Sequence, residues 1–431
     1  MLKTDPRYNH FVRILHEELV PAMGCTEPIA IAYGAAKARE ILGCTPQSVL
    51  VEASGNIIKN VKSVVVPNTN GLKGIEAAAA AGIIAGKADK ILEVISDVSE
   101  EEKEGIRCYL QECPITVRPA EGDVVFDIIL TLQAGENCVK LRIADYHTNI
   151  VLIEKNGEVL LSSGVVSEGS ESDGLTDRSC MSVEAVTDFA QTCDLADVAE
   201  LVERQIEYNY AIAQEGMKNP WGANIGKTLR EHYGEDIKVR ARYMAAAGSD
   251  ARMSGCEMPV IIVSGSGNQG LTASVPVIEY AKELGVDHET MVRAVLLSDL
   301  LTIHMKTGIG RLSAYCGAVS AGCAAGAAIA FLHGGGFREI AHTLVNSVAI
   351  VSGMICDGAK ASCAAKIATA VDAGILGWKM FQNGQEFRGG DGIVTKGVEK
   401  TIANIGRLGQ IGMRETDRVI VRIMTNQPLE G

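Results

Sequence analysis

The chain shows two patterns of hydrophobic and polar positions. Residues 7–20 are amphipathic and, like most of the chain beyond residue 180, have the apolar spacing of helices. Residues 47–163 instead contain short runs rich in β-branched residues and separated by turn residues, such as SVLVEAS, VVFDIILTLQ and CVKLRIAD. Runs of this kind predict strands. The pattern therefore predicts a mostly helical protein with one strand-rich segment.

Turn and capping signals refine the strand-rich segment. Asn156-Gly157 stands between two strand-like runs and predicts a hairpin, because both residues adopt a positive φ readily. Two helices are predicted within the segment, over residues 71–86 and 99–112. The second begins with Ser99, followed three residues later by Glu102, which is a capping box. These features predict an α+β arrangement in this part of the chain.

A stretch rich in Ser, Gly and Asp separates the two patterns, and we predict that residues 166–179 form a linker. The fold class that follows is α+β. A large, mostly helical domain is built from the N-terminal helices and the C-terminal half, residues 1–44 and 180–431. A smaller α/β domain, residues 45–165, is inserted into it.

Composition limits the class of partner. The 431 residues carry a formal net charge of −13, which argues against nucleic acid or an anionic membrane surface as a partner. The uncharged run from Ala314 to Leu332 is rich in Gly, Ala and Ser, so we predict a helix buried in the protein and not a membrane span. We expect a small-molecule ligand, and the scarcity of surface charge clusters is compatible with a homo-oligomer.

Twelve cysteines are the most informative part of the composition. The first residues, MLKTDPRYNHFVRIL, contain no apolar signal core, so we expect reduced thiols in the cytoplasm and not disulfides. Cys316, Cys323, Cys356 and Cys363 lie on a background of Gly, Ala and Ser, which permits close backbone approach to a bulky inorganic group. We interpret this stretch as the binding site of an iron–sulfur cluster.

Spacing decides which of these cysteines are suitable ligands. Residues seven apart on one helix are separated by about 10 Å along its axis. Cys356 and Cys363 therefore share a site only if the turn signal at Asp357-Gly358 interrupts the helix. Cys363 and Cys316 are each predicted to begin a helix, where free N–H groups favour an anionic ligand.

Cys25 has the same setting, because Pro28 is a favourable first residue for the helix that follows. Cys323 lies inside its helix and is not expected to be a ligand. Each cysteine alone also fits a buried packing role. Zinc is an alternative metal, but no Cys-x2-Cys pair or neighbouring His pair supports a zinc site. The three cysteines at helix starts together favour the cluster.

A second candidate site is the SGSGNQG loop, which follows a short apolar run and precedes a predicted helix. Its glycines leave N–H groups exposed, and its side chains add donors suited to a carboxylate, namely Ser264, Ser266, Asn268 and Gln269. A structural turn is the alternative. Arg311 and Lys360 are the cations best placed beside the cysteines to hold a substrate carboxylate. His304 and Lys306 lie further away in the sequence.

Three motifs together resemble a known family. Cys316 with Cys356-Asp357-Gly358, the SGSGNQG loop and the N-terminal MGCTEP sequence resemble the L-cysteine desulfidases over essentially the whole chain. The helical part is more distantly similar to the α domain of iron–sulfur L-serine dehydratases. The resemblance implies a [4Fe–4S] lyase, independent of pyridoxal phosphate, that converts L-cysteine into pyruvate, ammonia and hydrogen sulfide.

The two families imply different ligand sets. Cys316, Cys356 and Cys363 match the three cluster ligands of the dehydratase pattern, whereas Cys25, Cys316 and Cys356 match the cysteines of the desulfidases. Cys25 is therefore expected to be either a fourth ligand or a catalytic thiol. The chain lacks the C-terminal cysteine of the dehydratases and has Cys-Asp-Gly where they have Cys-Asp-Pro. These departures favour cysteine over serine as the substrate.

Three thiolate ligands leave one iron of such a cluster open as a Lewis acid. We expect that iron to bind the substrate while a base removes the α-proton and the SGSGNQG loop, with Arg311 or Lys360, orients the carboxylate. The base is either Cys25, as a thiolate whose pKa the helix start lowers, or Lys360. An L-serine dehydratase is the alternative enzyme. A non-enzymatic amino-acid-binding protein with a vestigial cluster site is the alternative outside enzymes.

Overall fold

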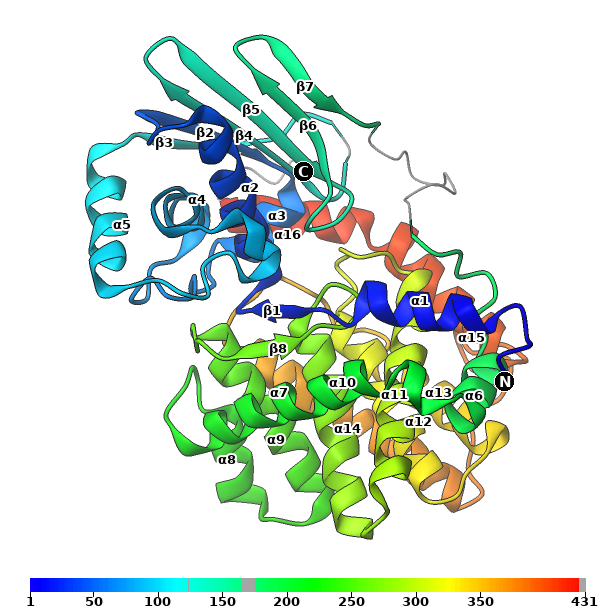
Figure 1. Cartoon of the computed structure of the whole chain (residues 1–431). Helices are drawn as coiled ribbons and strands as arrows, with labels where there is room; N and C mark the ends of the chain where they lie inside the picture. Colours follow the sequence, from blue (N-terminus) through cyan, green and yellow to red (C-terminus); the bar gives the residue numbers. More distant parts are fainter. Residues whose placement is uncertain (123, 165–174, 426–431) are drawn as a thin grey trace.

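A mixed sheet forms one end of the molecule (Figure 1). The computed structural model describes residues 1–122, 124–164 and 175–425. The sheet has the strand order β3-β2-β4-β5-β6-β7, in which β2 is parallel to β3 and the other neighbours are antiparallel. Its strands are β2 (Ser48–Ala53), β3 (Ile115–Pro119), β4 (Asp127–Ala134), β5 (Asn137–Ala144), β6 (Ile150–Lys155) and β7 (Glu158–Ser162).

Alternating apolar residues give the sheet a buried face. In β2, Val49, Val51 and Ala53 are buried and the residues between them are half-buried, as the period of two of a strand requires. Helix α2 (Thr26–Leu42) packs on this sheet so closely that a Cβ at Gly34 would lie 2.6 Å from Cδ1 of Leu130. Helix α2, which precedes the predicted domain boundary at residue 44, thus packs against α4, η1 and strands β4 and β5.

In the described part of the chain, four further helices belong to the same end of the molecule as the sheet. Helix α4 packs against α2 and α5, and α3 follows β2. The bounds are α3 (Gly55–Val61), α4 (Gly74–Ala85), the 3-10 helix η1 (Ala88–Glu93) and α5 (Glu100–Glu112). The capping box of Ser99 and Glu102 is present at the start of α5, which confirms that prediction. The hairpin is also confirmed, because Asn156 and Gly157 connect β6 to β7 with positive φ values.

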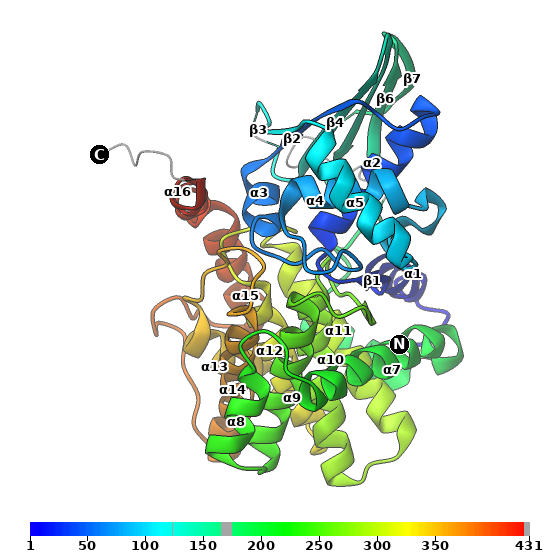
Figure 2. The same cartoon turned by 90° about the vertical axis from the view of Figure 1, so that its left-hand side faces the viewer.

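A bundle of helices forms the other end (Figure 1, Figure 2). The uncharged helix α12 lies among α10, α11, α13 and α14, which confirms the predicted buried helix. The bundle contains α6 (Val183–Thr192), η2 (Leu195–Asp197), α7 (Ala199–Lys218), α8 (Ile225–Tyr233), α9 (Ile237–Met253), α10 (Gly267–Leu284), α11 (His288–Thr307), α12 (Gly317–Leu332), α13 (Phe337–Val351), α14 (Cys363–Gln382) and α15 (Val398–Arg407). Among the described residues, no helix is both long and apolar enough to cross a membrane.

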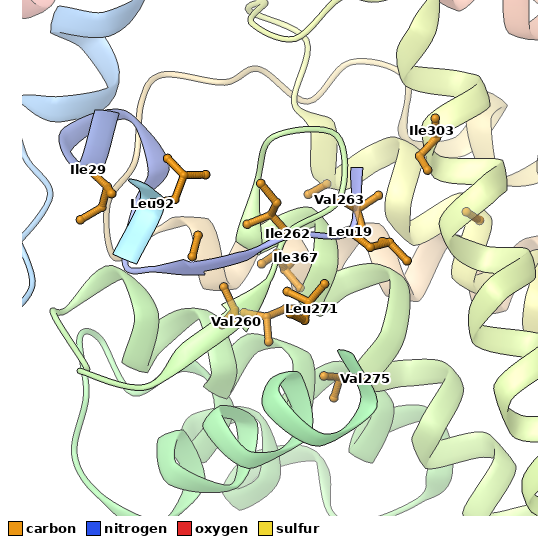
Figure 3. Packing of buried hydrophobic residues seen from close by; sticks show 14 of the residues in the cluster. Leu19, Ile29, Leu92, Val260, Ile262, Val263, Leu271, Val275, Ile303 and Ile367 are labelled. Carbon is orange, nitrogen blue, oxygen red and sulfur yellow. The ribbon is translucent and has the colours of Figure 1, made fainter. Parts of the chain in front are cut away.

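Short elements connect the two ends. After α1 (Tyr8–Glu18), strand β1 (Pro21–Met23) pairs antiparallel with β8 (Pro259–Ile261) of the helical part. Figure 3 shows Leu19, Val263 and Leu271 among the buried hydrophobic residues of this junction. After η3 (Leu408–Gly412), helix α16 (Arg414–Thr425) packs against α3. Chain segments far apart in sequence therefore meet at this junction.

The α+β fold class is confirmed, with a large helical part and a smaller unit of sheet and helices between its N-terminal and C-terminal segments. The unit lies in the chain between β1 and α6. Of the predicted linker, residues 166–174 lie outside the described part of the chain.

Helices α12 and α14 approach each other through glycines. A Cβ at Gly374 would lie 2.1 Å from the carbonyl oxygen of Gly322, and a Cβ at Gly326 would lie 2.4 Å from that of Gly374. Such distances are far inside van der Waals contact, so the two backbones touch. Because Cys316 and Cys363 stand at the starts of these two helices, the glycine contact also fixes how far apart the two cysteines lie.

We expect Gly374→Ala to lower the free energy of unfolding by about 1–3 kcal/mol or more, because the added methyl group forces the two helices apart. The measurement is the urea midpoint followed by circular dichroism. Gly353→Ala is the matched control, because nothing lies within 4 Å of the added Cβ. Equal midpoints for the two variants would contradict the close helix contact.

Candidate functional site

Four cysteines from distant parts of the chain line one small cavity of about 110 Å³, namely Cys25, Cys316, Cys356 and Cys363. Cys25 is the N-cap of α2, Cys316 is the N-cap of α12, and Cys363 is the first residue of α14. The three predicted helix starts are therefore confirmed. The free N–H groups and partial positive charge at these helix ends favour an anion in the cavity.

Backbone hydrogen bonds place Cys316 beside Cys356. An isolated antiparallel bridge joins the residues that precede them. The N–H of Cys356 donates to the carbonyl of Ala314 at 2.6 Å, and the N–H of Cys316 donates to that of Met354 at 3.2 Å. Burial raises the pKa of Cys316 to about 12, and the nearby thiols of Cys356 and Cys363 add to the increase. The three thiols thus lie close enough to influence one another.

The chain between Cys356 and Cys363 is not helical, as the Asp357-Gly358 turn signal predicts. Gly358 has a φ of +92°, and a Cβ there would lie 2.2 Å from the carbonyl oxygen of Lys59. Only glycine satisfies both the positive φ and the close approach. The turn therefore presses this cysteine loop against α3 of the sheet-containing part.

Two lysines hold the same loop. Lys360 and Lys366 both form salt bridges with Asp357. Burial alone raises the pKa of Asp357. The hydrogen bonds from the two lysines outweigh burial and lower this pKa to about 2. Nζ of Lys360 also donates to the carbonyls of Asp357 and Gly358, each at 3.1 Å. Lys360 is absent from the described lining of the cavity, whereas Lys366 belongs to it.

Cys25 lies in a buried, acidic setting. Its thiol donates a hydrogen bond to Oε2 of Glu27 at 2.9 Å. Burial, and then the charge of Glu27, raise the pKa of Cys25 well above its ordinary value. The expectation that the helix start lowers this pKa is therefore wrong, because desolvation of the thiolate outweighs the helix end. Cys25 is a neutral thiol near pH 7.

The SGSGNQG loop provides another wall of the cavity, and all four of its predicted side chains line it, namely Ser264, Ser266, Asn268 and Gln269. The backbone turns at Ser264, whose φ is +48°, and α10 begins at Gly267. The first N–H groups of α10 therefore add to the donors around the cavity.

The same loop contacts two of the cysteine-bearing helices. Thr26, next to Cys25, donates to the carbonyl of Gly265 at 2.9 Å. The amide of Gln269 lies over Gly317, where a Cβ would come within 2.6 Å of its Cδ. The loop is thus packed against the starts of α2 and α12.

A larger cavity of about 1420 Å³ adjoins the small one, and the two share Ser264, Lys306, Arg311, Leu312 and Ser313. Nη2 of Arg311 bonds to Oε1 of Glu18 at 3.1 Å, and its guanidinium lies 5.8 Å from the ring centroid of Tyr146. Burial lowers the pKa of Lys306 to about 8. The positive groups Lys306 and Arg311 therefore line both cavities.

His147 reaches the cavity from the loop between β5 and β6. The side chain is 5% exposed, and its Nε2 has no hydrogen-bond partner among the described residues. Its ring packs edge-on against Phe126, with 4.8 Å between centroids. Burial lowers the pKa of His147 to about 4. The imidazole is therefore neutral near pH 7 and has an unused nitrogen.

The candidate ligands that line the cavity are all thiols. In the described ranges, no group of three or more His, Cys, Asp or Glu side chains is arranged to hold one ion. In a four-iron cluster each thiolate binds a different iron, so the ligands surround the cluster and do not converge on one point. An all-thiol set of Cys316, Cys356 and Cys363, facing one cavity among helix starts, has the donor chemistry of such a cluster.

Every predicted site residue except Lys360 lines the small cavity. Lys306, which the sequence placed further out, lies in it, whereas His304 bonds to Glu399 at 2.8 Å. Residues that the sequence did not mark also line it, namely Glu27, Asn60, His147, Arg252 and Lys366. Glu27 stands within the MGCTEP motif and was within reach of sequence reasoning. Lys366 stands three residues after Cys363 and was also within reach. Asn60, His147 and Arg252 are far from any motif, and no local pattern distinguishes them.

We expect the stability of the iron-free protein to fall as the pH drops from about 6.5 to about 4. In this range the unfolded state protonates His147, whose ordinary pKa is about 6.5, while the folded state does not. The free energy of unfolding then decreases by up to about 3 kcal/mol, and His147→Gln abolishes this part of the decrease. Urea titrations at several pH values provide the measurement.

The exposed His232 supplies the control for this titration. His232→Gln is expected to keep the pH dependence of the unchanged protein. Parallel curves for His147→Gln and the unchanged protein would show that the imidazole is not held neutral.

Comparisons with known proteins agree with this geometry. Residues 89–422 match the serine dehydratase alpha chain family, and this segment contains Cys316, Cys356 and Cys363 but not Cys25. The chain is 62% identical over 427 residues to the UPF0597 protein DSY1109 of Desulfitobacterium hafniense, covering 99% of each chain. It is 51% identical over 419 residues to a UPF0597 protein of Lachnoclostridium phytofermentans, covering 97% of this chain and 100% of that protein.

A third relative extends the same picture to another genus. The UPF0597 protein FN1147 of Fusobacterium nucleatum is 48% identical over 426 residues, which cover 98% of this chain and 100% of that protein. The likeness therefore spans both the sheet and the helical bundle. The chain belongs to the serine dehydratase alpha chain family and, within it, groups with the UPF0597 proteins.

Proposed function

We propose that the protein is a [4Fe–4S]-dependent lyase that breaks L-cysteine into pyruvate, ammonia and hydrogen sulfide. The observation that carries the proposal is the convergence of Cys316, Cys356 and Cys363 on one cavity beside the SGSGNQG loop. Membership of the serine dehydratase alpha chain family supports a lyase that acts on a small amino acid. The twelve cysteines are free thiols, which suits a reducing compartment, so we place the enzyme in the cytoplasm.

The reaction that we propose is a β-elimination. A base takes the α-proton, the Cβ–S bond breaks, and the sulfur leaves with the bonding electron pair. The resulting aminoacrylate tautomerises to an imine, which water hydrolyses to pyruvate and ammonia. The chemistry that a bound cluster supplies is a Lewis-acidic iron, not ligated by protein, for the leaving sulfur.

Among the side chains of the cavity, we propose His147 as the base that removes the α-proton of the substrate. Its imidazole lines the cavity, and its Nε2 has no hydrogen-bond partner among the described residues, so this ring nitrogen is open to a substrate. Cys25 is unsuited to be the base because its raised pKa keeps it protonated. It stays a candidate for a fourth ligand or a catalytic thiol. Lys360 forms a salt bridge with Asp357 and donates hydrogen bonds to two backbone carbonyls, and it does not line the cavity.

L-serine dehydratase is the second candidate function, because the matched family carries that description. The two activities differ in the leaving group, which is sulfide from cysteine and hydroxide from serine. A thiolate is the softer ligand and suits iron–sulfur chemistry better. We therefore propose L-cysteine as the preferred substrate.

Anaerobically reconstituted protein is expected to release sulfide and pyruvate in equal amounts from L-cysteine and little pyruvate from L-serine. Cys316→Ala, Cys356→Ala and Cys363→Ala are expected to lose both iron and activity. Cys108→Ser, which changes an exposed thiol outside the cavity, is the control and keeps both. Iron content and the two products are measured together. If the protein turns over L-serine and L-cysteine only inhibits it, the dehydratase replaces the desulfidase as the proposed function. If iron is bound but neither amino acid reacts, the lyase proposal is abandoned.

His147→Gln is expected to lower kcat for L-cysteine by about 100- to 10,000-fold, because general base catalysis contributes about that much. Iron content stays unchanged, since the imidazole is not among the proposed ligands. His232→Gln is the matched control and keeps full activity. If His147→Gln retains kcat, another group removes the α-proton.

A further inference from the structure

Two buried groups of opposite charge line the small cavity, Arg252 and Glu27. Arg252 is 2% exposed and Glu27 is 8% exposed. A buried charge is costly unless a partner compensates it. In the described part of the chain, neither residue forms a salt bridge with the other or with a third residue. Each residue lies within the electrostatic influence of the other, and Arg252 also has a side-chain hydrogen bond with Cys25, but neither has a direct ion pair among the described residues.

The guanidinium of Arg252 is held in place beneath the SGSGNQG loop. Arg252 stands in α9, and its Nε has no hydrogen-bond partner among the described residues. A Cβ at Gly267 would lie 2.3 Å from that Nε, so the first residue of α10 has no side chain and leaves room for the guanidinium. Burial lowers the pKa of Arg252, although Cys25, Glu27 and Cys363 lie near it. An arginine nevertheless stays protonated in proteins.

The carboxyl group of Glu27 is only partly satisfied. Its Oε1 accepts from Nδ2 of Asn60 at 3.0 Å, and its Oε2 accepts from Sγ of Cys25 at 2.9 Å. The nearby hydroxyl of Thr26 donates its proton to the carbonyl of Gly265 instead. A carboxylate offers about four acceptor positions. At least one position is therefore left for a donor inside the cavity.

Arg311, one of the two cations that the sequence favoured for a substrate carboxylate, differs in this respect. It forms a salt bridge with the buried Glu18, which Arg178 also contacts. Its charge is thus compensated by the protein itself. Arg252 is the arginine of the cavity whose charge still needs an anion.

We propose that Arg252 and Glu27 clamp the two charged groups of a free α-amino acid, with the carboxylate on Arg252 and the ammonium on Glu27. The assignment rests on the proposed function in taking an amino acid as the ligand. It extends that function by naming the groups that select a zwitterion over amines, hydroxy acids and blocked amino acids. The N–H groups at the start of α10, close to Arg252, complete the surroundings of the carboxylate.

The test uses three ligands of one size that do not undergo elimination. L-Alanine carries both charges, L-alaninamide lacks the carboxylate, and L-lactate lacks the ammonium. Their dissociation constants are measured by calorimetry with the cluster-containing protein and with Arg252→Gln and Glu27→Gln. Arg242→Gln is the matched control, because Arg242 stands in the same helix and faces Asp372 at 3.7 Å, outside the cavity. Arg311→Gln tests the rival cation.

A crossed pattern is expected. The unchanged protein binds L-alanine about 100-fold more tightly than either analogue, the cost of leaving one buried charge unpaired. Arg252→Gln loses the preference over L-alaninamide and keeps the preference over L-lactate, and Glu27→Gln does the reverse. Arg242→Gln and Arg311→Gln keep both preferences. A general loss of folding weakens the binding of all three ligands together and does not produce this pattern.

The clamp is overturned if the unchanged protein does not prefer L-alanine over both analogues. It is also overturned if each variant loses both preferences equally, or if Arg311→Gln and not Arg252→Gln loses the preference over L-alaninamide. Binding is read without turnover, so it separates the two proposals. A protein that shows the crossed pattern but releases no sulfide from L-cysteine keeps the clamp and loses the desulfidase assignment.

Discussion

The site depends on the electrostatic balance of groups that are buried together. The charged forms of thiols, carboxyls and amines are unfavourable away from water. Each is stable there only where an opposite charge or dipole faces it. The starts of α2, α12 and α14 provide such dipoles at one point, and Lys306 and Lys366 add positive charge beside them. A cavity built in this way is suited to hold an anionic group in a protein whose net charge is itself strongly negative.

Both ends of the molecule contribute to this balance. The helical bundle supplies the three candidate ligands and Arg252. The start of α2 supplies Cys25 and Glu27, and the loop between β5 and β6 supplies His147. The pairing of β1 with β8 and the contact of Gly358 with α3 hold the two parts together at the cavity. The site is therefore complete only where the inserted unit is docked on the bundle.

Local signals made part of this predictable from the sequence. Proline after Cys25, the Asp357-Gly358 turn and the glycine-rich loop each act within a few residues, and the structure follows them. The positions of His147 and Arg252 depend on how distant segments pack, and no local pattern encodes that. The same limit applies to Cys25, because the helix start was visible in the sequence but the desolvation that outweighs it was not. Residue type and spacing thus identified the cysteines of the site. Their burial in the folded protein, which determines whether they ionise, was not predictable in the same way.

The two adjoining cavities differ more than tenfold in volume, at about 1420 Å³ and 110 Å³. Lys306 and Arg311 line both cavities, so a compound in the larger one contacts charged groups that also line the smaller one. Occupation of the outer space therefore changes the charge that the inner cavity presents to its own ligand.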